Sequence, residues 1–299
     1  MNNIALVGLG VWGKKLLRTF SEICSIGFVC TTGKDENISW LKDNHPGILH
    51  TTDYETLLAR DDIDAVIIAT PINTHYMLAK KALKANKHIF LEKPLTNNIL
   101  EAEELLDLSK KNKKLLFVGN VFLYHSAFQE IKDILNGQKI EYIYASWEKF
   151  GSFGEDLLWN LLPHDLGIIF LLMGYPSKFE IIEQKGFITD IDILVLRLKY
   201  EDGRSCLLQY NRIADKKNKR LTIITDTMSF AWSNNDLFTI TKENLQNTLT
   251  HSSDKDPLML EAQEFLSLLE KKEYRNDLSN LDLDVVRLLS AINNSLTKE

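Results

Sequence analysis

Short apolar runs alternate with amphipathic segments over the first part of the chain. Each run is apolar throughout rather than at every second position, which is typical of strands buried on both faces of a parallel sheet. The predicted strands are 4–7, 64–69, 88–91 and 115–118, with one more ending at residues 29–30, and the predicted helices are 74–85 and 97–111. Residues 1–120 are therefore predicted to form a doubly wound α/β domain with a parallel sheet.

After Gly119 the pattern changes to longer strand-like runs that follow one another through short turns. Strands are predicted at 140–147, 178–182, 191–200, 206–211 and 220–225, and helices at 126–135, 258–272 and 282–296. The short turns favour antiparallel pairing in a meander. Residues 121–299 are thus predicted to form an α+β domain with an open, mainly antiparallel sheet, whose C-terminal helices are free to pack back on the first domain.

One strand of this second sheet, residues 191–200, alternates between apolar and polar positions only in its second half. We therefore expect helices to cover one face of the sheet and the other face to be partly apolar. An exposed apolar face of this kind predicts oligomerisation, as a homodimer or a homotetramer. The mostly polar segment 244–256 is predicted to be a mobile loop.

The composition is that of a soluble globular protein, with 44% hydrophobic and 25% charged residues. Its net charge of −6 argues against nucleic acid as a partner. No apolar run is long enough to cross a membrane and the first residues show no secretory cleavage pattern, so a cytoplasmic location is expected. The three cysteines form no CxxC motif, which fits a reducing compartment. No metal site is predicted.

The first apolar run leads directly into the sequence GLGVWG, residues 8–13, and then into an amphipathic helix. Gly8 permits a tight turn, Gly10 lets backbone N–H groups approach a pyrophosphate, and Gly13 lets the helix pack closely on the strand. The helix N-terminus then faces the phosphates with unpaired N–H groups. This context predicts a dinucleotide-binding Rossmann domain, the alternative being a tight turn that binds no ligand.

Two further segments follow predicted strands, and both therefore lie at the carboxyl edge of the sheet, where ligands of open α/β folds bind. The first, ATPINTH at residues 69–75, is either a capped loop or a loop against the ribose and nicotinamide; His75 alone is more often structural. The second is Glu92-Lys93-Pro94. Lys93 is a candidate for orienting a hydroxyl and stabilising oxyanion charge, with a salt-bridged surface turn as the alternative. The bond before Pro94 is a candidate cis peptide.

The sequence Trp159-Asn160-Leu161-Leu162-Pro163-His164-Asp165 stands just before an apolar segment. Proline suits the first position of a helix, so we expect His164 in the first helical turn. There the helix dipole disfavours the imidazolium form and leaves a neutral ring ready to accept a proton. The alternative is a packed histidine. Near the predicted domain boundary, Tyr124 and His125 either reach a substrate or pack the junction.

The motifs GLGVWG, ATPINTH, EKP and PHD, in this order, resemble the Gfo/Idh/MocA family of NAD(P)-dependent oxidoreductases. The resemblance implies a Rossmann domain, a second domain with an open sheet, and hydride transfer to or from a hydroxyl-bearing carbon of a sugar, cyclitol or sugar nucleotide. It implies that Lys93 contacts substrate and nicotinamide and that His164 is the acid/base. Asn160 stands where many members have Asp, so a hydrogen bond to substrate is expected of it. By resemblance, residues 121–125 and Trp159-Asn160 favour a sugar-nucleotide substrate.

The second strand is followed by Thr31, Thr32 and Lys34, with no carboxylate where an NAD enzyme usually binds the ribose 2′-hydroxyl. These side chains could accept a 2′-phosphate, which favours NADP over NAD, although the nearby Asp35 leaves NAD open. The predicted coenzyme contacts are Gly8, Gly10, Val11, Trp12, Gly13, Thr31, Thr32, Lys34, Ala69, Thr70, Pro71, Asn73, His75, Glu92, Lys93 and Asn120.

The predicted function is accordingly an NAD(P)-dependent dehydrogenase or reductase with Lys93 and His164 as catalytic residues. Tyr124, His125, Trp159 and Asn160 are the predicted substrate contacts. The rival hypothesis is a dinucleotide-sensing pseudo-enzyme that binds NAD(P) and a protein partner without turnover, which Asn160 in place of an acid would favour.

Overall fold

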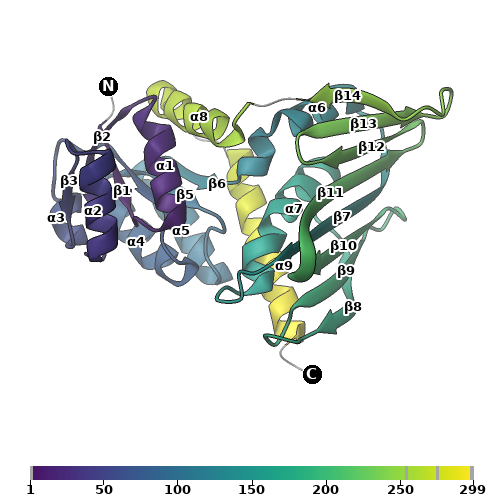
Figure 1. Ribbon diagram of the computed structural model, residues 1–299, viewed down its shortest axis with the longest axis horizontal. Coiled ribbons are helices and arrows are strands. Elements are labelled where there is room, and N and C mark those ends of the chain that lie inside the picture. Colours follow the sequence, from purple (N-terminus) through teal and green to yellow (C-terminus); the bar gives the residue numbers. More distant parts are fainter. Residues whose placement is uncertain (1–2, 253–254, 274–275, 297–299) are drawn as a thin grey trace. The chain divides into compact units, whose positions relative to one another are not determined.

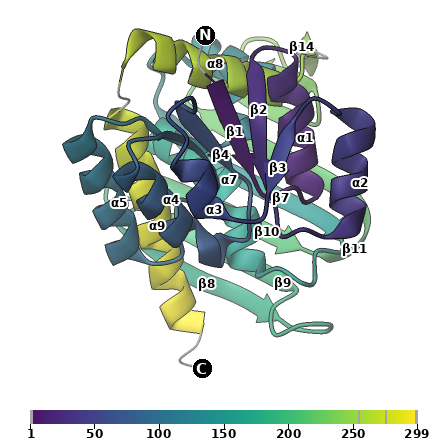
Figure 2. The ribbon, with the colours of Figure 1, turned by 90° about the vertical axis from the view of Figure 1, so that its left-hand side faces the viewer.

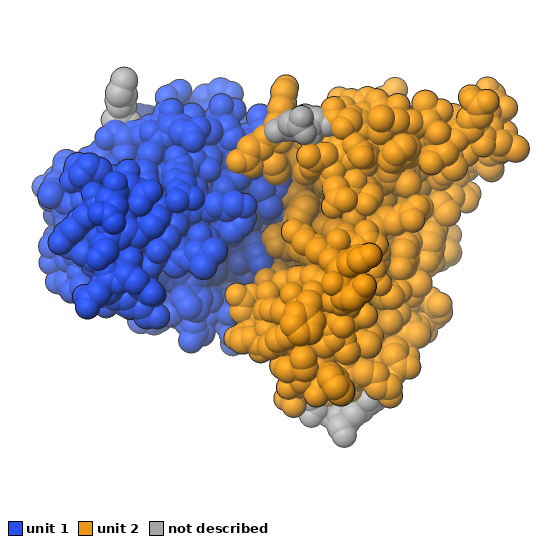
Figure 3. All heavy atoms as spheres, in the orientation of Figure 1, with its two compact units in different colours: residues 1–121, 258–290 blue, residues 122–257, 291–299 orange. Residues whose placement is uncertain are grey.

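The chain divides into two units in the computed structural model, which describes residues 3–252, 255–273 and 276–296 (Figures 1 and 3). Unit 1 combines residues 1–121 with residues 258–290, and unit 2 combines residues 122–257 with residues 291–299. The helix α9 (Asn276–Leu296) belongs to unit 1 up to Ser290 and to unit 2 from Ala291. Among the described helices, none is long and apolar enough to cross a membrane.

Unit 1 contains a six-stranded parallel sheet in the order β3-β2-β1-β4-β5-β6, the order expected of a Rossmann fold. Figure 2 shows β1 to β4 of this sheet. Its strands are β1 (Asn3–Val7), β2 (Ser25–Cys30), β3 (Leu49–Thr51), β4 (Ala65–Ile68), β5 (His88–Glu92) and β6 (Leu116–Gly119). Its helices before residue 121 are α1 (Val11–Ser21), α2 (Asp35–Asn44), α3 (Tyr54–Leu58), α4 (Ile72–Lys84) and α5 (Ile99–Asn112). The predicted doubly wound α/β fold with a parallel sheet is confirmed.

The strands of this sheet are apolar throughout because both faces are covered. On one face, Val66 and Ile68 of β4 join the core formed with α3, α4 and α5. On the other face, Phe90 of β5 packs edge-on against Phe20 of α1, with ring centroids 5.4 Å apart. Burying side chains on both faces removes a large apolar area from water, which is the main stabilisation of such a sheet.

The helix α8 (Pro257–Lys271) supplies the last part of this second face. Phe265 lies edge-on to Phe20, Phe90 and Phe117, with ring centroids between 5.5 and 6.1 Å apart. Edge-to-face contacts of this kind add to the stabilisation from burial alone. The hydrophobic core of unit 1 therefore includes residues more than 130 positions beyond the end of β6.

Unit 2 contains an eight-stranded sheet in the order β14-β13-β12-β11-β7-β10-β9-β8. Its strands are β7 (Ile140–Phe150), β8 (Lys178–Lys185), β9 (Ile193–Lys199), β10 (Ser205–Asn211), β11 (Ile213–Thr225), β12 (Met228–Ser233), β13 (Asp236–Thr241) and β14 (Thr248–Ser252). Its remaining elements are the 3₁₀ helix η1 (Val121–Tyr124) and the helices α6 (Ser126–Leu135) and α7 (Leu157–Met173).

The predicted mainly antiparallel sheet is confirmed, but the prediction of a simple meander is wrong. The first strand, β7, lies between β10 and β11 and pairs parallel with β10. The segment 244–256, predicted to be a mobile loop, contains β14, which pairs with β13; residues 253–254 lie outside the described residues. The pairing of β7 with β10 joins distant segments, which local patterns do not contain, whereas β14 pairs with the preceding strand and was missed because its sequence is mostly polar.

Alternate positions of the central strands face the buried side of this sheet. Ile143 and Ala145 of β7, with Leu208 of β10, are fully buried. The intervening positions, such as Tyr142 and Tyr144, are partly exposed, so the other face is partly apolar. Oligomerisation through that face stays a prediction.

Candidate active site

The turn after β1 has the backbone geometry that a dinucleotide phosphate site needs. Gly8 has a φ of +96°, and a Cβ there would lie 2.5 Å from the carbonyl oxygen of Ala69. A Cβ on Gly13 would lie 2.0 Å from the carbonyl oxygen of Gly8, so only glycine permits this close approach of α1 to β1. Both glycines are therefore required by the turn itself, whether or not a ligand is bound.

Gly10 is different, because its surroundings are open. A Cβ built on Gly10 meets nothing within 4 Å, and the following Val11 is 92% exposed. Gly10 is the N-cap of α1, and no side chain caps the helix there. The first N–H groups of α1 are thus accessible beside a position where a side chain would occupy empty space, which fits a bound pyrophosphate.

The loops predicted to meet at the sheet edge do so. Val7 pairs with Cys30 and with Ile68, Ile68 pairs with Leu91, and Leu91 pairs with Val118. The segments that follow these residues therefore begin side by side at the carboxyl edge of the sheet. They are the glycine turn, the segment 31–34, the ATPINTH segment, the EKP segment and Asn120.

His75 joins two of these loops. It is 1% exposed, and its ring nitrogens lie 2.9 Å from the carbonyl oxygens of Pro94 and Thr70. Burial lowers the pKa of His75, although the two carbonyl oxygens act in the opposite direction. The ring therefore holds the ATPINTH and EKP segments together from within unit 1. The predicted cis peptide before Pro94 is confirmed.

Trp12 and Glu92 form a contact that the sequence did not predict. The indole Nε1–H of Trp12, in the first turn of α1, donates a hydrogen bond to Oε1 of Glu92 at the end of β5. Burial raises the pKa of Glu92 to about 7, while the Trp12 hydrogen bond and the charge of Lys93 act to lower it. The glycine turn and the EKP segment are thereby connected directly by side chains.

At the end of β2, Thr32 and Lys34 are exposed, whereas Thr31 is buried, with its backbone N–H bonded to the carbonyl of Thr51. Lys34 is the N-cap of α2, and Asp35 lies in the first turn of that helix. Of the predicted 2′-phosphate contacts, Thr32 and Lys34 therefore have accessible side chains.

In unit 2, α7 begins earlier than predicted. Its N-cap is Asp156, whose carboxylate accepts the backbone N–H of Trp159, and Pro163 lies inside the helix. The prediction that His164 occupies the first turn is therefore wrong, and the helix dipole does not account for its protonation state. Asn160 and His164 nevertheless lie four residues apart, on one face of α7.

Aromatic rings surround His164. Its ring lies edge-on to Phe122, with centroids 5.0 Å apart, and 5.5 Å from Trp147 of β7. His164 is 9% exposed. Of the predicted substrate contacts, Trp159 and Asn160 are partly exposed, and His125 is buried as the N-cap of α6, accepting the backbone N–H of Ala127.

Lys219 of β11 also lies against these rings, and sequence reasoning missed it. Its Nζ is 4.0 Å from the ring centre of Phe122 and 4.2 Å from that of Trp147. The same ammonium group lies 2.6 Å from Oδ1 of Asp165, and Tyr210 donates a hydrogen bond to the other carboxylate oxygen. Burial lowers the pKa of Lys219 and Asp165 opposes that effect. A buried ion pair thus supports the rings that contact His164.

Arg212 fixes the segment that leads into α7. Its guanidinium donates to the carbonyl oxygens of Ser152 and Glu155 and forms an ion pair with Asp192, with Nε and Oδ1 2.9 Å apart. Both side chains of the pair are at most 5% exposed. Backbone and hydroxyl donors of residues 187–189 complete the bonding of Asp192 and hold its pKa far below the usual range.

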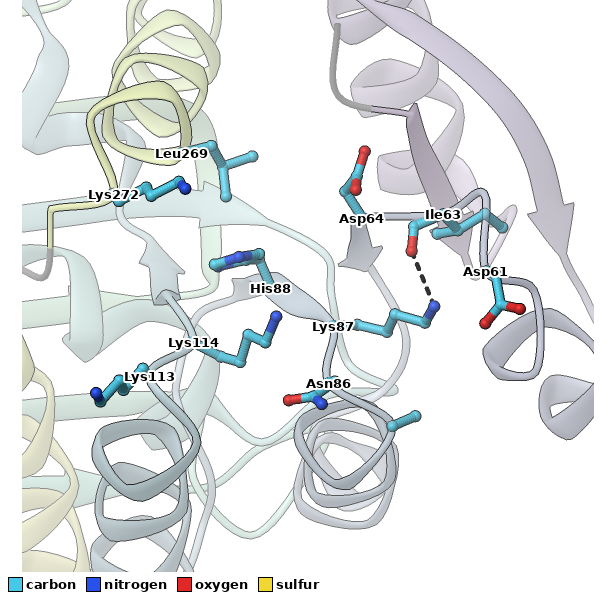
Figure 4. Close-up of a pocket in the computed structure, with 11 residues that line it drawn as sticks. Asp61, Ile63, Asp64, Asn86, Lys87, His88, Lys113, Lys114, Leu269 and Lys272 are labelled. Carbon is cyan, nitrogen blue, oxygen red and sulfur yellow. Dashed lines mark hydrogen bonds between the residues drawn. The ribbon is translucent and has the colours of Figure 1, made fainter.

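A pocket of about 620 Å³ lies at the opposite, amino edge of the unit 1 sheet (Figure 4). It is lined by Asp61, Ile63, Asp64, Ala85, Asn86, Lys87, His88, Lys113, Lys114, Leu269 and Lys272. The helices α4, α5 and α8 all end there, and lysines at helix C-termini complement the negative end of the helix dipole. The position of the pocket at the C-terminal ends of these helices explains the lysines around it without a ligand, so we do not assign the coenzyme to this pocket. In the described part of the chain no group of three metal-ligating side chains occurs.

The first part of the chain, which contains the glycine turn, matches a known family. Residues 2–120 match the family model described as "Oxidoreductase family, NAD-binding Rossmann fold" under the name GFO_IDH_MocA. A dTDP-3,4-didehydro-2,6-dideoxy-alpha-D-glucose 3-reductase from Streptomyces violaceoruber is 37% identical over 87 residues, which is 29% of this chain and 25% of the relative. The aligned part is thus a quarter of that relative's length.

The UDP-N-acetylglucosamine 3-dehydrogenase of Acidithiobacillus ferrooxidans is 26% identical over 175 residues, covering 56% of this chain and 54% of the relative. Its solved structure superposes with a TM-score of 0.87 at 20% identity, covering 96% of this chain and 95% of that one. A 3-ketoreductase from Actinomadura kijaniata, solved with NADP and TDP-benzene, gives a TM-score of 0.83 at 17% identity, over 97% and 96% of the two chains. At these identities the structures establish the shared fold.

Proposed function

We propose that this chain, whose residues 2–120 belong to the Gfo/Idh/MocA oxidoreductase family, transfers a hydride between a nicotinamide coenzyme and a hydroxyl-bearing carbon of a sugar nucleotide. The observation that carries the proposal is the start of α1. An uncapped helix N-terminus follows a glycine turn at the carboxyl edge of a parallel sheet, and the space at Gly10 is open.

The coenzyme would be held by the backbone of residues 8–13, with the ATPINTH and EKP segments beside it. When bound, its nicotinamide ring supplies the hydride acceptor or donor. The accessible side chains of Thr32 and Lys34, with no carboxylate at the end of β2, favour NADP over NAD. A Lys34→Glu variant is expected to lower the preference for NADP over NAD, measured as the ratio of the two dissociation constants.

Lys93 and His164 are the catalytic residues of the proposal. Lys93 would orient the reacting oxygen and stabilise negative charge that develops on it. His164 would exchange the proton of that oxygen, and its neutral form is the one able to accept it. Asn160, one helical turn before His164, would hydrogen-bond the substrate without contributing a charge.

Two observations favour a sugar-nucleotide substrate. The first is that the two sequence relatives described above are a dTDP-sugar 3-reductase and a UDP-N-acetylglucosamine 3-dehydrogenase by name. In this chain, the rings of Phe122 and Trp147 lie beside His164, and aromatic rings commonly form the walls of small-molecule sites.

The test measures turnover of a panel of sugars and nucleotide sugars with NAD and with NADP. Turnover is monitored by the absorbance of the reduced nicotinamide. Lys93→Ala and His164→Ala are each expected to lower kcat/KM by about 100-fold or more while the protein stays folded. Lys84→Ala, at the exposed end of α4, and His50→Ala, on exposed β3, are the matched controls.

If both Lys93→Ala and His164→Ala turned over substrate as fast as the wild type, the catalytic roles proposed for Lys93 and His164 would be refuted. Tight binding of NAD(P) without turnover on any member of the panel would instead support a dinucleotide-sensing protein, and a partner recovered by pull-down would strengthen that reading.

A further inference from the structure

The buried face of α8 carries an acid where an apolar residue is expected. Glu261 is 1% exposed, and it occurs on the same face as Leu258 and Phe265, which are also buried. Phe265 packs on the aromatic side chains of the unit 1 sheet. A carboxyl group buried in such surroundings is costly in its ionised form unless it is paired.

Glu261 lies next to the edge of the sheet where the coenzyme is proposed to bind. The backbone N–H of Asn120, directly after β6, bonds to its carboxyl group, and its Oε1 has no hydrogen-bond partner among the described residues. The charge of Glu92, at the end of β5, acts on this carboxyl group. Two carboxyl groups from distant parts of the chain thus interact within unit 1, with Glu261 buried and Glu92 half-buried.

Glu92 has the better environment for a negative charge. It accepts the indole N–H of Trp12, and the charge of Lys93 favours its ionised form. Gly119 pairs with Glu92 in the sheet register, and a Cβ on Gly119 would lie 3.4 Å from Oε1 of Glu92. The ring of Phe90 is closer, with its Cζ 3.0 Å from that Cβ position, so glycine makes room here mainly for Phe90, beside the carboxylate that Trp12 contacts.

Two interacting carboxyl groups in a medium of low dielectric do not readily both ionise, because the like charges repel. Burial and the charge of Glu92 raise the pKa of Glu261 well above its ordinary value, whereas the partners of Glu92 oppose the effect of its burial. The proton of the pair is therefore expected on Glu261 and the charge on Glu92.

We propose that Glu261 is a positioning residue of the coenzyme site: its carboxyl group stays in the acid form, so that the charge of the pair rests on Glu92, which holds Trp12 in the first turn of α1. The proposal rests on the proposed function in so far as that turn binds a dinucleotide. It assigns to α8, some 170 residues beyond the EKP segment, a direct part in shaping the phosphate end of the site.

The test follows the indole N–H resonance of Trp12 in the full-length ¹⁵N-labelled protein, assigned with a Trp12→Phe variant. In the wild type this resonance should titrate with a midpoint near the Glu92 pKa of about 7. Glu261→Gln, which is neutral like the acid form, should leave the midpoint unchanged. A fall of about one pH unit or more in Glu261→Gln would show that Glu261 is charged in the wild type and would overturn the proposal.

A second measurement separates positioning from a purely structural role. Glu261→Leu keeps an apolar helix face but removes the acceptor of the Asn120 N–H; it should shift the Trp12 resonance and weaken NADPH or NADH binding about tenfold. Glu261→Gln should restore both. Glu270, exposed on the same helix, gives the matched controls Glu270→Leu and Glu270→Gln.

If Glu261→Leu changed only the melting temperature and left the Trp12 resonance and coenzyme affinity as in the wild type, the positioning role would be refuted. If the wild type bound neither coenzyme, the proposed function would fail, and the Trp12 titration alone would still decide which carboxyl group carries the charge.

Discussion

Gly10 and Gly13 stand three residues apart in one motif but have different reasons to be glycine. At Gly13 the backbone of Gly8 leaves no room for a methyl group, whereas at Gly10 a methyl group would project into open space. Gly13 is therefore required by the fold, whereas Gly10 is proposed to leave room for the coenzyme. The motif alone does not separate these roles, because both positions appear as G in the sequence.

Substituting these two glycines tests that difference. Gly13→Ala should destabilise the protein by several kcal/mol, about 2–4, because the backbone must move to relieve the clash. Gly10→Ala should change the free energy of unfolding by less than about 1 kcal/mol but weaken coenzyme binding about tenfold or more. Urea unfolding and fluorescence titration with NADPH measure the two effects. Equal destabilisation by both substitutions would contradict the assignment.

The pair of Lys219 and Asp165 gives a second prediction for single residues. Lys219→Met should lower the free energy of unfolding by about 3–5 kcal/mol, because the carboxylate of Asp165, which is 3% exposed, would lose the cation that pairs with it. The double variant Lys219→Met/Asp165→Asn should recover much of that loss, since the amide oxygen can still accept from Tyr210. The neighbouring exposed Lys217→Met is the control. A double variant no more stable than Lys219→Met would argue against the pair as the cause.

Arg212 controls an element rather than a single contact, because it bonds the segment before α7 to the end of β10. Arg212→Met should lower the free energy of unfolding by about 3–5 kcal/mol, as Asp192 would remain buried and charged. Arg197→Met, which removes a partly exposed ion pair on the neighbouring strand, should cost less than about 1 kcal/mol. Similar midpoints of urea unfolding for the two variants would refute this role.

His88, which lines the pocket at the amino edge of the sheet, is expected to make the stability of the protein sensitive to acid. Burial and the charges of Lys114 and Lys272 lower the pKa of His88 from 6.5 to about 4, and its Nδ1 accepts the N–H of Leu115. The folded protein thus binds fewer protons at this ring than the unfolded chain, so stability should fall as the pH drops from 6.5 to about 4.

His88→Asn retains an acceptor for the Leu115 N–H and should make that decrease of the melting temperature with falling pH shallower. His50→Asn, on the exposed strand β3, is the control and should follow the wild type. Parallel curves for wild type and His88→Asn would show that His88 does not contribute to the acid sensitivity.

Many elements could be predicted from the local pattern, but two kinds of feature were missed. The strands β12 to β14 were missed although they pair with near neighbours in the sequence, and the pairing of distant strands was missed as well. The helix α6 was predicted at its observed bounds, 126–135. The start of α7 was misplaced because Pro163 suits a first turn, whereas the capping carboxylate of Asp156 lies well before it. The parallel pairing of β7 with β10 joins residues about 60 positions apart, which no local pattern encodes.

In the candidate site too, some residues could be predicted from the local sequence and others could not. The glycine turn and the EKP segment could be found because each directly follows a strand, and parallel strands bring their carboxyl ends together. Lys219 could not be placed near His164 without the pairing of β11 with β7. Glu261 could have been noticed as a charged residue at the apolar spacing of its helix, although its proximity to Glu92 could not.

At the scale of the whole molecule, the first 121 residues are not a complete unit. Phe265 and Val286, both from the last segment, belong to the hydrophobic core of unit 1. A fragment of residues 1–121 should therefore lack a cooperative unfolding transition, because one face of its sheet would expose aromatic side chains to water. The same fragment joined to residues 258–290 by a flexible linker should regain a cooperative unfolding transition.

Circular dichroism during thermal unfolding, together with the dispersion of amide resonances, distinguishes these two fragments. A sharp transition in the 1–121 fragment alone would contradict the dependence on α8 and α9. The linked fragment should also bind the coenzyme, whereas the shorter one should not.

The late position of α8 also sets an order of events during translation. The strands β1 to β6 leave the ribosome first, but the helix that covers Phe90 and Phe117 follows only after the whole of residues 122–257. At typical synthesis rates this interval lasts roughly ten seconds. During this interval the nascent strands of unit 1 leave Phe90 and Phe117 without the helix that covers them, so chaperone occupancy on this part of the chain should end when α8 emerges.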